Sequence, residues 1–163
     1  ILDVLNKKTT VEQNEHAIRL CKEIGLFVNG TVMIGNPTET EDDLKKTYHF
    51  IKKNPIDSLG VCITTPYPGT TLWKWCENNR LIPSNFQWTD FLYDRVAIMC
   101  STTLSRPTII QWKQRMDMLI LQKTNPAYFL KKLFSRPDNI IRYVWGLRKN
   151  PRHKLQRIIR SAL

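Results

Sequence analysis

The stretch GTVMIGNPTET, residues 30–40, decides the fold expected for this chain. Its first half continues a run of apolar and β-branched residues that begins at Phe27 and ends at Ile34. Such a run predicts a strand buried on both faces, as in a parallel sheet. The turn residues 35–37, Gly-Asn-Pro, then close the strand. The stretch therefore predicts a strand of a parallel sheet with a glycine turn directly after its carboxyl end.

Helical patterns flank this strand on both sides. Downstream, Thr38 and Glu41 have the spacing of a capping pair, and Glu39 is expected to act as a carboxylate at the positive end of the helix dipole. The pair Asn54-Pro55 is expected to end this helix, whose inner stripe is Leu44, Thr47, Tyr48 and Ile51. Residues 10–24 predict an earlier helix, which Gly25 stops and whose inner side is Val11, Ala17, Ile18, Cys21 and Ile24.

A second strand is expected at residues 59–64, LGVCIT, and it leads into the proline-rich loop TPYPGT at 65–70. Thr70 or Thr71 can cap a further helix with Leu72, Trp73 and Cys76 inward. This alternation of helix and strand predicts a parallel sheet or a (β/α) barrel. Two strands cannot close a barrel, and the first residue is Ile1, so the chain is expected to be part of a longer protein.

The composition changes after residue 85. An aromatic-rich stretch is followed by four helix starts that each carry a proline, at 105–107, 125–126, 135–137 and 150–151. Residues 1–105 hold 11 Lys and Arg against 12 Asp and Glu, whereas residues 106–163 hold 14 against 2. The sequence therefore predicts an α/β region at 1–85 and a helical, basic extension at 86–163.

The four cysteines do not form a local metal-binding motif. Cys21, Cys62, Cys76 and Cys100 are separated by 41, 14 and 24 positions, so each is expected to be a buried thiol in a reducing, cytoplasmic compartment. No stretch of the chain approaches the ~18 apolar residues that a membrane-spanning helix requires.

Three stretches together resemble a known family: ILDVLNKKTT at 1–10, GTVMIGNPTET at 30–40 and TPYPGT at 65–70. This succession resembles the second half of the barrel of radical S-adenosylmethionine (radical SAM) enzymes, and most of all the branch with an N-terminal cobalamin-binding domain. The resemblance implies an α/β fold: the C-terminal part of a partial (β/α) radical SAM barrel, followed by an all-helical basic extension.

The resemblance also implies an activity for the full-length parent. A [4Fe–4S] cluster on a CxxxCxxC loop would cleave SAM reductively to a 5′-deoxyadenosyl radical. That loop is absent from these 163 residues, so no catalytic or metal-binding residue is expected and the chain alone is expected to be inactive. The family implies cobalamin as a further cofactor, a lipid or tetrapyrrole as substrate, and a reductant protein of the flavodoxin or ferredoxin type as partner.

The same resemblance points to cofactor-binding residues. The stretch at 30–40 aligns with the family's fifth-strand motif, which lines the adenine of SAM, so Met33, Ile34, Gly35 and Asn36 are expected there. Adenine needs a flat apolar wall and a backbone that approaches closely at a glycine. Tyr67, in the loop at 65–70, is expected to line the mouth of the active site.

Other interpretations remain open at this point. The basic helices at 137–163 fit a solvated face or an anionic membrane surface, and nucleic acid is disfavoured because no recognised motif interleaves the charges. The α/β region could belong to an unrelated hydrolase or aldolase, although no nucleophile–base pair supports this. The chain could also be a non-enzymatic helical binding module with a basic, membrane- or nucleic-acid-associating tail.

Overall fold

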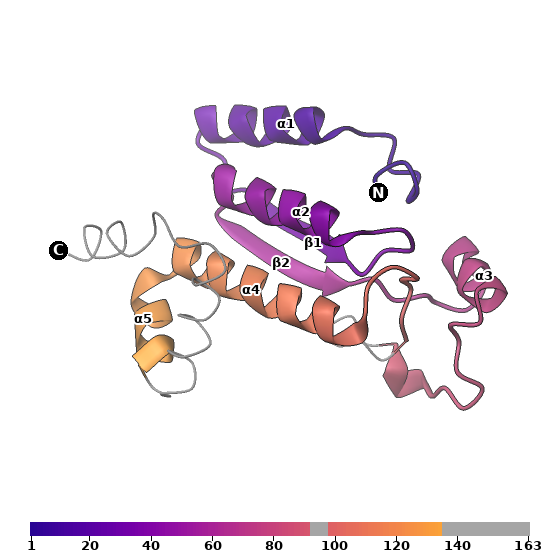
Figure 1. The fold of residues 1–163 in the computed structure, drawn as a ribbon. Coiled ribbons are helices and arrows are strands. Elements are labelled where there is room, and N and C mark those ends of the chain that lie inside the picture. The colour runs from indigo at the N-terminus through magenta and orange to yellow at the C-terminus, as the bar shows by residue number, and fades with distance from the viewer. Residues whose placement is uncertain (92–97, 135–163) are drawn as a thin grey trace. The chain divides into compact units, whose positions relative to one another are not determined.

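The computed structural model describes residues 1–91 and 98–134, without the side chains of 131–134. The chain divides into two compact units, residues 1–120 and 121–163, and each is considered by itself. The elements follow in the order α1 (Val11–Glu23), β1 (Asn29–Ile34), α2 (Glu41–Lys53), β2 (Ser58–Ile63), α3 (Thr71–Asn78), the 3-10 helix η1 (Trp88–Asp90), α4 (Arg106–Thr124) and α5 (Pro126–Phe134) (Figure 1).

The strands β1 and β2 form a parallel pair, with α2 as the crossover between them. Their register runs from Asn29 opposite Ser58 to Ile34 opposite Ile63. Successive side chains of a strand point to opposite faces of its sheet. In-register pairing therefore places Val32 and Val61 on one face, while Met33 lies beside Cys62 on the other.

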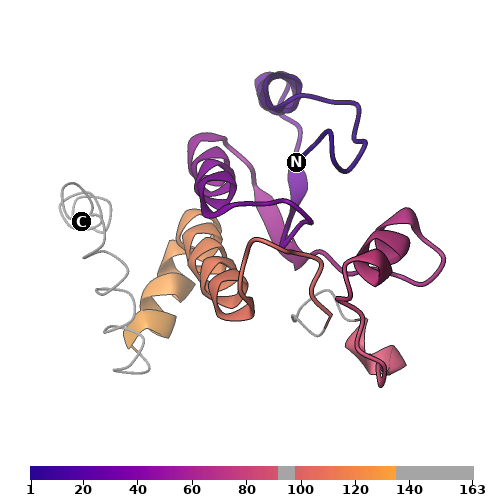
Figure 2. The same ribbon diagram turned by 45° about the vertical axis from the view of Figure 1, so that its right-hand side comes forward.

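Helices α2 and α4 cover the same face of this sheet, as Figures 1 and 2 show. The shared core combines strand residues with residues of both helices, and its buried members are Ile34, Leu44, Ile51, Val61, Ile63, Leu104, Ile109, Trp112, Met116 and Leu119. Because one hydrophobic cluster contains all of them, α4 stabilises the sheet although 42 residues lie between it and β2 in the chain.

The opposite face of the sheet is not covered by any element in the described part of the chain. Thirty-eight per cent of Met33 is exposed, Thr31 and Gly60 are exposed, and Cys62 is half-buried. The prediction that β1 is buried on both faces is therefore wrong for this structure. The apolar run did not indicate that one face is exposed. An alternating burial pattern cannot be read from the sequence when both sets of positions carry apolar or β-branched residues.

The helix termini agree with the sequence for α1 and differ by two residues for α2. Thr10 caps α1 through the amide of Gln13, and Gly25 follows its end with φ of 77°. At α2 the cap is Thr40, paired with Asp43, and not Thr38 with Glu41. The expected inner stripe of α1 is also wrong: none of its residues is buried, and Val11 is 47% exposed.

The later helices that the structure describes begin where the sequence predicts. Thr70 caps α3, and Trp73 and Cys76 are buried as expected. In α4 the buried residues are Ile109, Trp112, Met116 and Leu119. The two helices expected after Pro137 and Pro151 lie outside the described residues.

The α/β fold class is confirmed by these two parallel strands and the helices of the described ranges. Closure of a barrel, a boundary near residue 85 and a basic helical extension stay predictions. None of the helices described is long and apolar enough to cross a membrane.

Candidate cofactor-binding site

The site is built where β1 and β2 end side by side. Ligands of parallel α/β folds bind at the carboxyl ends of the strands. Here the Thr64 amide donates to the Ile34 carbonyl at 2.9 Å, and the Thr64 hydroxyl donates to Oδ1 of Asn36 at 2.8 Å. The segments that leave the two strands are thus tied together directly beyond the sheet.

A buried carboxylate, that of Glu39, sets the shape of the turn after β1. Its Oε2 accepts the amide of Gly35 at 2.6 Å and the amide of Asn36 at 3.1 Å, and Glu39 is 1% exposed. These bonds hold Gly35 at φ of 79°, a conformation that glycine adopts without steric cost. Burial raises the pKa of the Glu39 carboxyl, and the two amide donors oppose that rise.

The prediction that Glu39 acts at the positive end of the dipole of α2 is wrong, because Glu39 does not belong to the helix terminus. It precedes the capping Thr40 and bonds back into the turn, four and three residues upstream. A carboxylate placed four residues after a strand-ending glycine is the sequence signal that could have identified this role.

A third segment, residues 100–103, supports the turn from a distant part of the chain. Thr102 donates to the Pro37 carbonyl through both its amide and its hydroxyl, each at 3.2 Å. The Thr103 hydroxyl donates to the carbonyl of Glu39. Sequence reasoning missed this support, since nothing in the pattern at 98–105 links it to residues 35–40.

The four consecutive candidates differ in what they offer to a ligand. The side chain of Ile34 is fully buried in the core, and Asn36 is fully buried with its side-chain amide bonded to the carbonyl of Met33 at 3.2 Å. Met33 points from the uncovered face of the sheet. The structure thus brings an exposed thioether next to a fixed glycine turn, while Ile34 and Asn36 maintain that arrangement from within.

Tyr67 lies in the loop after β2 and belongs to an aromatic cluster. Its ring stacks on Phe91 with centroids 5.9 Å apart, and its hydroxyl donates to the Phe91 carbonyl at 3.1 Å. Phe91 also contacts Trp73, Phe86 and Trp88. Tyr67 is 48% exposed, Phe86 36% and Trp88 79%, so three rings of the cluster are exposed.

The described residues do not fit an iron–sulfur cluster. They contain no group of three or more His, Cys, Asp or Glu side chains that could hold a metal ion. The four cysteines are free thiols: Cys21 and Cys62 are half-buried, and Cys76 and Cys100 are buried. The strand ends thus present an exposed Met33 beside the fixed Gly35 turn, and the described residues contain no cluster of metal ligands.

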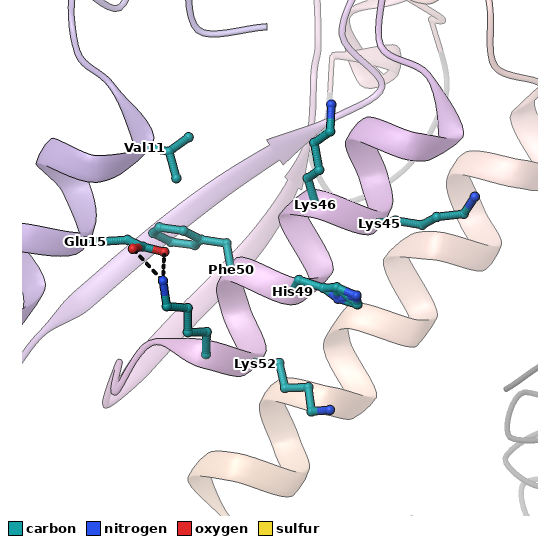
Figure 3. A pocket seen from close by; sticks show the side chains of 8 residues that line it. Val11, Glu15, Lys45, Lys46, His49, Phe50 and Lys52 are labelled. Atoms are coloured by element: carbon teal, nitrogen blue, oxygen red, sulfur yellow. Dashed lines mark hydrogen bonds and ion pairs between the residues drawn. The ribbon is translucent and has the colours of Figure 1, made fainter. Parts of the chain in front are cut away.

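A shallow hollow of about 680 Å³ lies elsewhere, between the outer surfaces of α1 and α2. Figure 3 shows Lys45, Lys46 and His49 along α2. Glu15 of α1 forms an ion pair with Lys53 at 2.8 Å. Lys45 and Lys46 bond Asp42 and Asp43 of their own helix. None of the predicted site residues lines this hollow, so it is separate from the site at the strand ends.

Comparisons with known proteins identify relatives of part of the chain. An uncharacterized methyltransferase of Pyrococcus horikoshii is 39% identical over 88 residues, which are 53% of this chain and 19% of the relative. The tRNA-2-methylthio-N(6)-dimethylallyladenosine synthase of Thermosipho africanus is 31% identical over 81 residues, 48% of this chain and 19% of the relative. The chain matches no protein-family model.

A third relative is the anaerobic magnesium-protoporphyrin IX monomethyl ester cyclase of Cereibacter sphaeroides, 37% identical over 73 residues. The match covers 45% of this chain and 12% of the cyclase. In all three cases the chain spans less than a fifth of the relative's length. These relatives are enzymes. The resemblance that the sequence predicted is confirmed, and the chain is homologous to enzymes of the radical SAM superfamily.

Proposed function

We propose that the strand ends of this chain form the adenine side of the SAM site in a radical SAM enzyme. The observation that carries the proposal is the turn at Gly35, fixed by buried Glu39 beside the exposed side chain of Met33. A flat aromatic ligand needs an apolar surface, and the exposed side chain of Met33 offers one at the strand ends.

The roles of the other site residues follow from their contacts. Ile34 and Asn36 are buried, so we propose that they position Met33 and the turn and do not touch the ligand through their side chains. Thr64 joins this group, because it ties the segment after β2 to Asn36. Contact with adenine then falls to the side chain of Met33. Gly35 is itself buried, with its open side against Ile109, and shapes the turn.

The remaining parts of the site would belong to a longer protein. SAM bound with a [4Fe–4S] cluster supplies, on reductive cleavage, the 5′-deoxyadenosyl radical of this superfamily. The described residues do not supply cluster ligands, so we propose that they come from outside this chain, whose matches cover only 12% to 19% of the relatives named. Cobalamin and a flavodoxin- or ferredoxin-type reductant belong to the same proposal, as does inactivity of the chain by itself.

For the substrate, the proposal is a lipid or a tetrapyrrole that undergoes methylation or cyclisation. The cyclase relative is named for a magnesium-protoporphyrin ester. Tyr67 and Trp88 add exposed aromatic surface just beyond β2, and such rings pack well against a flat macrocycle.

The basic tail at 137–163 lies outside the described residues, and its role stays a proposal. We propose that it holds a cytoplasmic enzyme at an anionic membrane surface, because cationic residues alternate there with apolar ones. Sedimentation with anionic liposomes should pellet the full chain more than a chain that ends at Arg136. Equal pelleting of the two would remove the membrane from the proposal.

SAM binding by the longer protein, loaded with its cluster, tests the adenine contact. Met33→Ala should weaken SAM binding about tenfold, which corresponds to a lost contact of about 1.4 kcal/mol. Thr31→Ala is the matched control. Thr31 lies on the same uncovered face as Met33, two residues further from the carboxyl end of β1. Unchanged SAM affinity in Met33→Ala, or an equal loss in Thr31→Ala, would contradict the assignment.

A further inference from the structure

Residues 98–104, the bridging segment, belong to no helix or strand and yet are fixed at both ends by buried side chains. At one end Ile98 packs in the cluster of Trp73 and Phe91. At the other end Leu104 belongs to the core that covers the sheet. Because the two anchors lie in different hydrophobic clusters, the core of the molecule sets the position of the bridging segment.

Between these anchors, two threonines bond the turn that follows β1. The amide and the hydroxyl of Thr102 both donate to the carbonyl of Pro37, each at 3.2 Å. The hydroxyl of Thr103 donates to the carbonyl of Glu39. These partners are 65 and 64 residues apart in the sequence, so the bonds exist only in the folded chain.

Ser101 holds the second of these threonines in place. Its side chain is buried, and its Oγ accepts the amides of Thr103 at 3.3 Å and Leu104 at 3.1 Å. The same Oγ lies 3.2 Å from the hydroxyl oxygen of Thr103. Since Thr103 gives its own hydrogen to Glu39, Ser101 is the donor in this contact. The direction of the Thr103 hydroxyl toward the turn is therefore fixed from within the bridging segment.

The bonds inside the turn and the bonds from the bridging segment have different effects. The carboxylate of Glu39 bonds amides of its own turn and therefore fixes the shape of the turn. Thr102 and Thr103 bond the turn to a segment anchored in the core, so they fix where the turn lies. The side-chain amide of Asn36 bonds the carbonyl of Met33 at 3.2 Å, so the placement of the turn extends to Met33.

We propose that Thr102 and Thr103 are positioning residues for SAM, which act through the turn on Met33 and do not touch the ligand. The inference rests on the proposed function, because it takes Met33 as the contact with adenine. Without the two hydroxyls, part of the free energy of SAM binding is used to place the turn, so the affinity falls. At saturating SAM the turn is placed in nearly every molecule, so the maximal rate is retained.

The double variant Thr102→Val, Thr103→Val tests this role in the longer protein, reconstituted with its cluster and given SAM and a chemical reductant. Valine replaces each hydroxyl with a methyl group, while the bond from the Thr102 amide remains. We expect the SAM concentration for half-maximal formation of 5′-deoxyadenosine to rise about tenfold, the scale of one or two lost hydrogen bonds. The maximal rate should stay within about twofold of the wild-type rate.

Two further variants separate positioning from a general loss of structure. The double variant Thr102→Ser, Thr103→Ser keeps both hydroxyls and should restore the wild-type SAM concentration for half-maximal rate. Thr108→Val is the matched control, because the Thr108 hydroxyl bonds Ser105 at 2.8 Å, within the bridge to α4, and not the turn. Partial unfolding would lower the maximal rate and leave the required SAM concentration unchanged.

Four results would overturn the positioning role. They are an unchanged SAM requirement in the double valine variant, an equal rise in the serine variant, an equal rise in Thr108→Val, and a lower maximal rate alone. Wild-type protein that forms no 5′-deoxyadenosine would instead contradict the proposed function, and the positioning role with it. Active wild-type protein with an unchanged double valine variant would contradict the positioning role only.

Discussion

At Gly35 the backbone has φ of 79°, and a Cβ placed there would meet Cδ1 of Ile109 at 3.3 Å. Gly35→Ala should therefore combine left-handed strain of about 1–2 kcal/mol with a clash against α4. Gly25→Ala is the matched control, because Gly25 has φ of 77° but no atom within 4 Å of the same position. Urea denaturation should show the larger loss for Gly35→Ala, and equal losses would contradict close packing of the turn on Ile109.

Glu39 is the second residue whose replacement tests the site. Glu39→Ala leaves the buried amides of Gly35 and Asn36 without an acceptor, which should cost about 1–3 kcal/mol. Urea denaturation at neutral pH measures this loss. A loss close to zero would mean that the carboxylate does not hold the turn.

The pH dependence of stability gives an independent test of Glu39. A carboxyl whose folded pKa is raised contributes stability that is fully present below its usual value of 4.5 and is lost as pH rises through the folded pKa. Glu39→Gln cannot ionise, so its stability relative to wild type should improve as pH rises from 4 to 7. A constant difference between the two proteins over this range would contradict the raised pKa.

At the level of single residues, the sequence predicted where β1 ends but not which of its side chains are exposed. Residues 33–36 do lie at the strand ends, because the glycine turn marks where a strand stops. Whether a side chain points to the core or to open surface depends on which sheet face the helices cover. That is decided by residues far away in the chain, such as Ile109, which the local pattern at 30–40 does not contain.

Among the elements, α4 depends on one aromatic anchor. Trp112 is 5% exposed, donates to Oε1 of Glu41 at 3.3 Å, and lies under the guanidinium of Arg115 at 4.3 Å. Trp112→Ala should destabilise the fold by about 3–5 kcal/mol in thermal or chemical unfolding. Ile110→Ala, at a position 40% exposed on the same helix, should cost far less. Similar costs for both would contradict the packing of α4 on the sheet.

The junction of α1 with the sheet depends on Asp57. Its carboxylate accepts from Nζ of Lys22 at 2.8 Å and from the Val28 amide at 2.7 Å, and both donors lower its pKa. Asp57→Asn should lower the unfolding temperature at pH 7. A carboxyl with a lowered pKa contributes stability above its usual value of 3.8, and this stability is lost as pH falls through the folded pKa. The difference in unfolding temperature between wild type and Asp57→Asn should therefore be smaller at pH 3 than at pH 7.

The control for this junction is Asp42→Asn, which breaks an exposed bond within α2. Because exposed pairs of this kind contribute little, the unfolding temperature of Asp42→Asn should stay close to that of wild type. An Asp57→Asn variant that behaves like this control would contradict the role of Asp57 in joining α1 to the sheet.

Most elements could be predicted from the sequence, since caps and glycine stops act locally. Thr10, Gly25 and Thr70 mark helix ends that the structure confirms. The sequence could not decide which threonine caps α2, because an acidic residue follows both Thr38 and Thr40 three positions later. Glu39 decides between them: its carboxylate folds back into the turn, and the helix begins after Thr40.

For the molecule as a whole, the distribution of helices around the sheet is the main finding. Helices α2 and α4 share one face, and the face with Met33 and Cys62 is open in the described part of the chain. A doubly wound sheet has helices on both faces, whereas a (β/α) barrel has all of its helices outside and its inner strand face toward the interior. In the barrel that the sequence predicts, this open face would be the inner one.

The most direct test of the central claim uses the longer protein, reconstituted anaerobically with iron and sulfide and given SAM and a chemical reductant. The quantity to measure is 5′-deoxyadenosine formed per protein. We expect wild-type protein to form it and Met33→Ala to need a higher SAM concentration for the same rate. A protein that holds its cluster and binds SAM, yet forms no 5′-deoxyadenosine, would contradict the assignment of these strand ends to a radical SAM site.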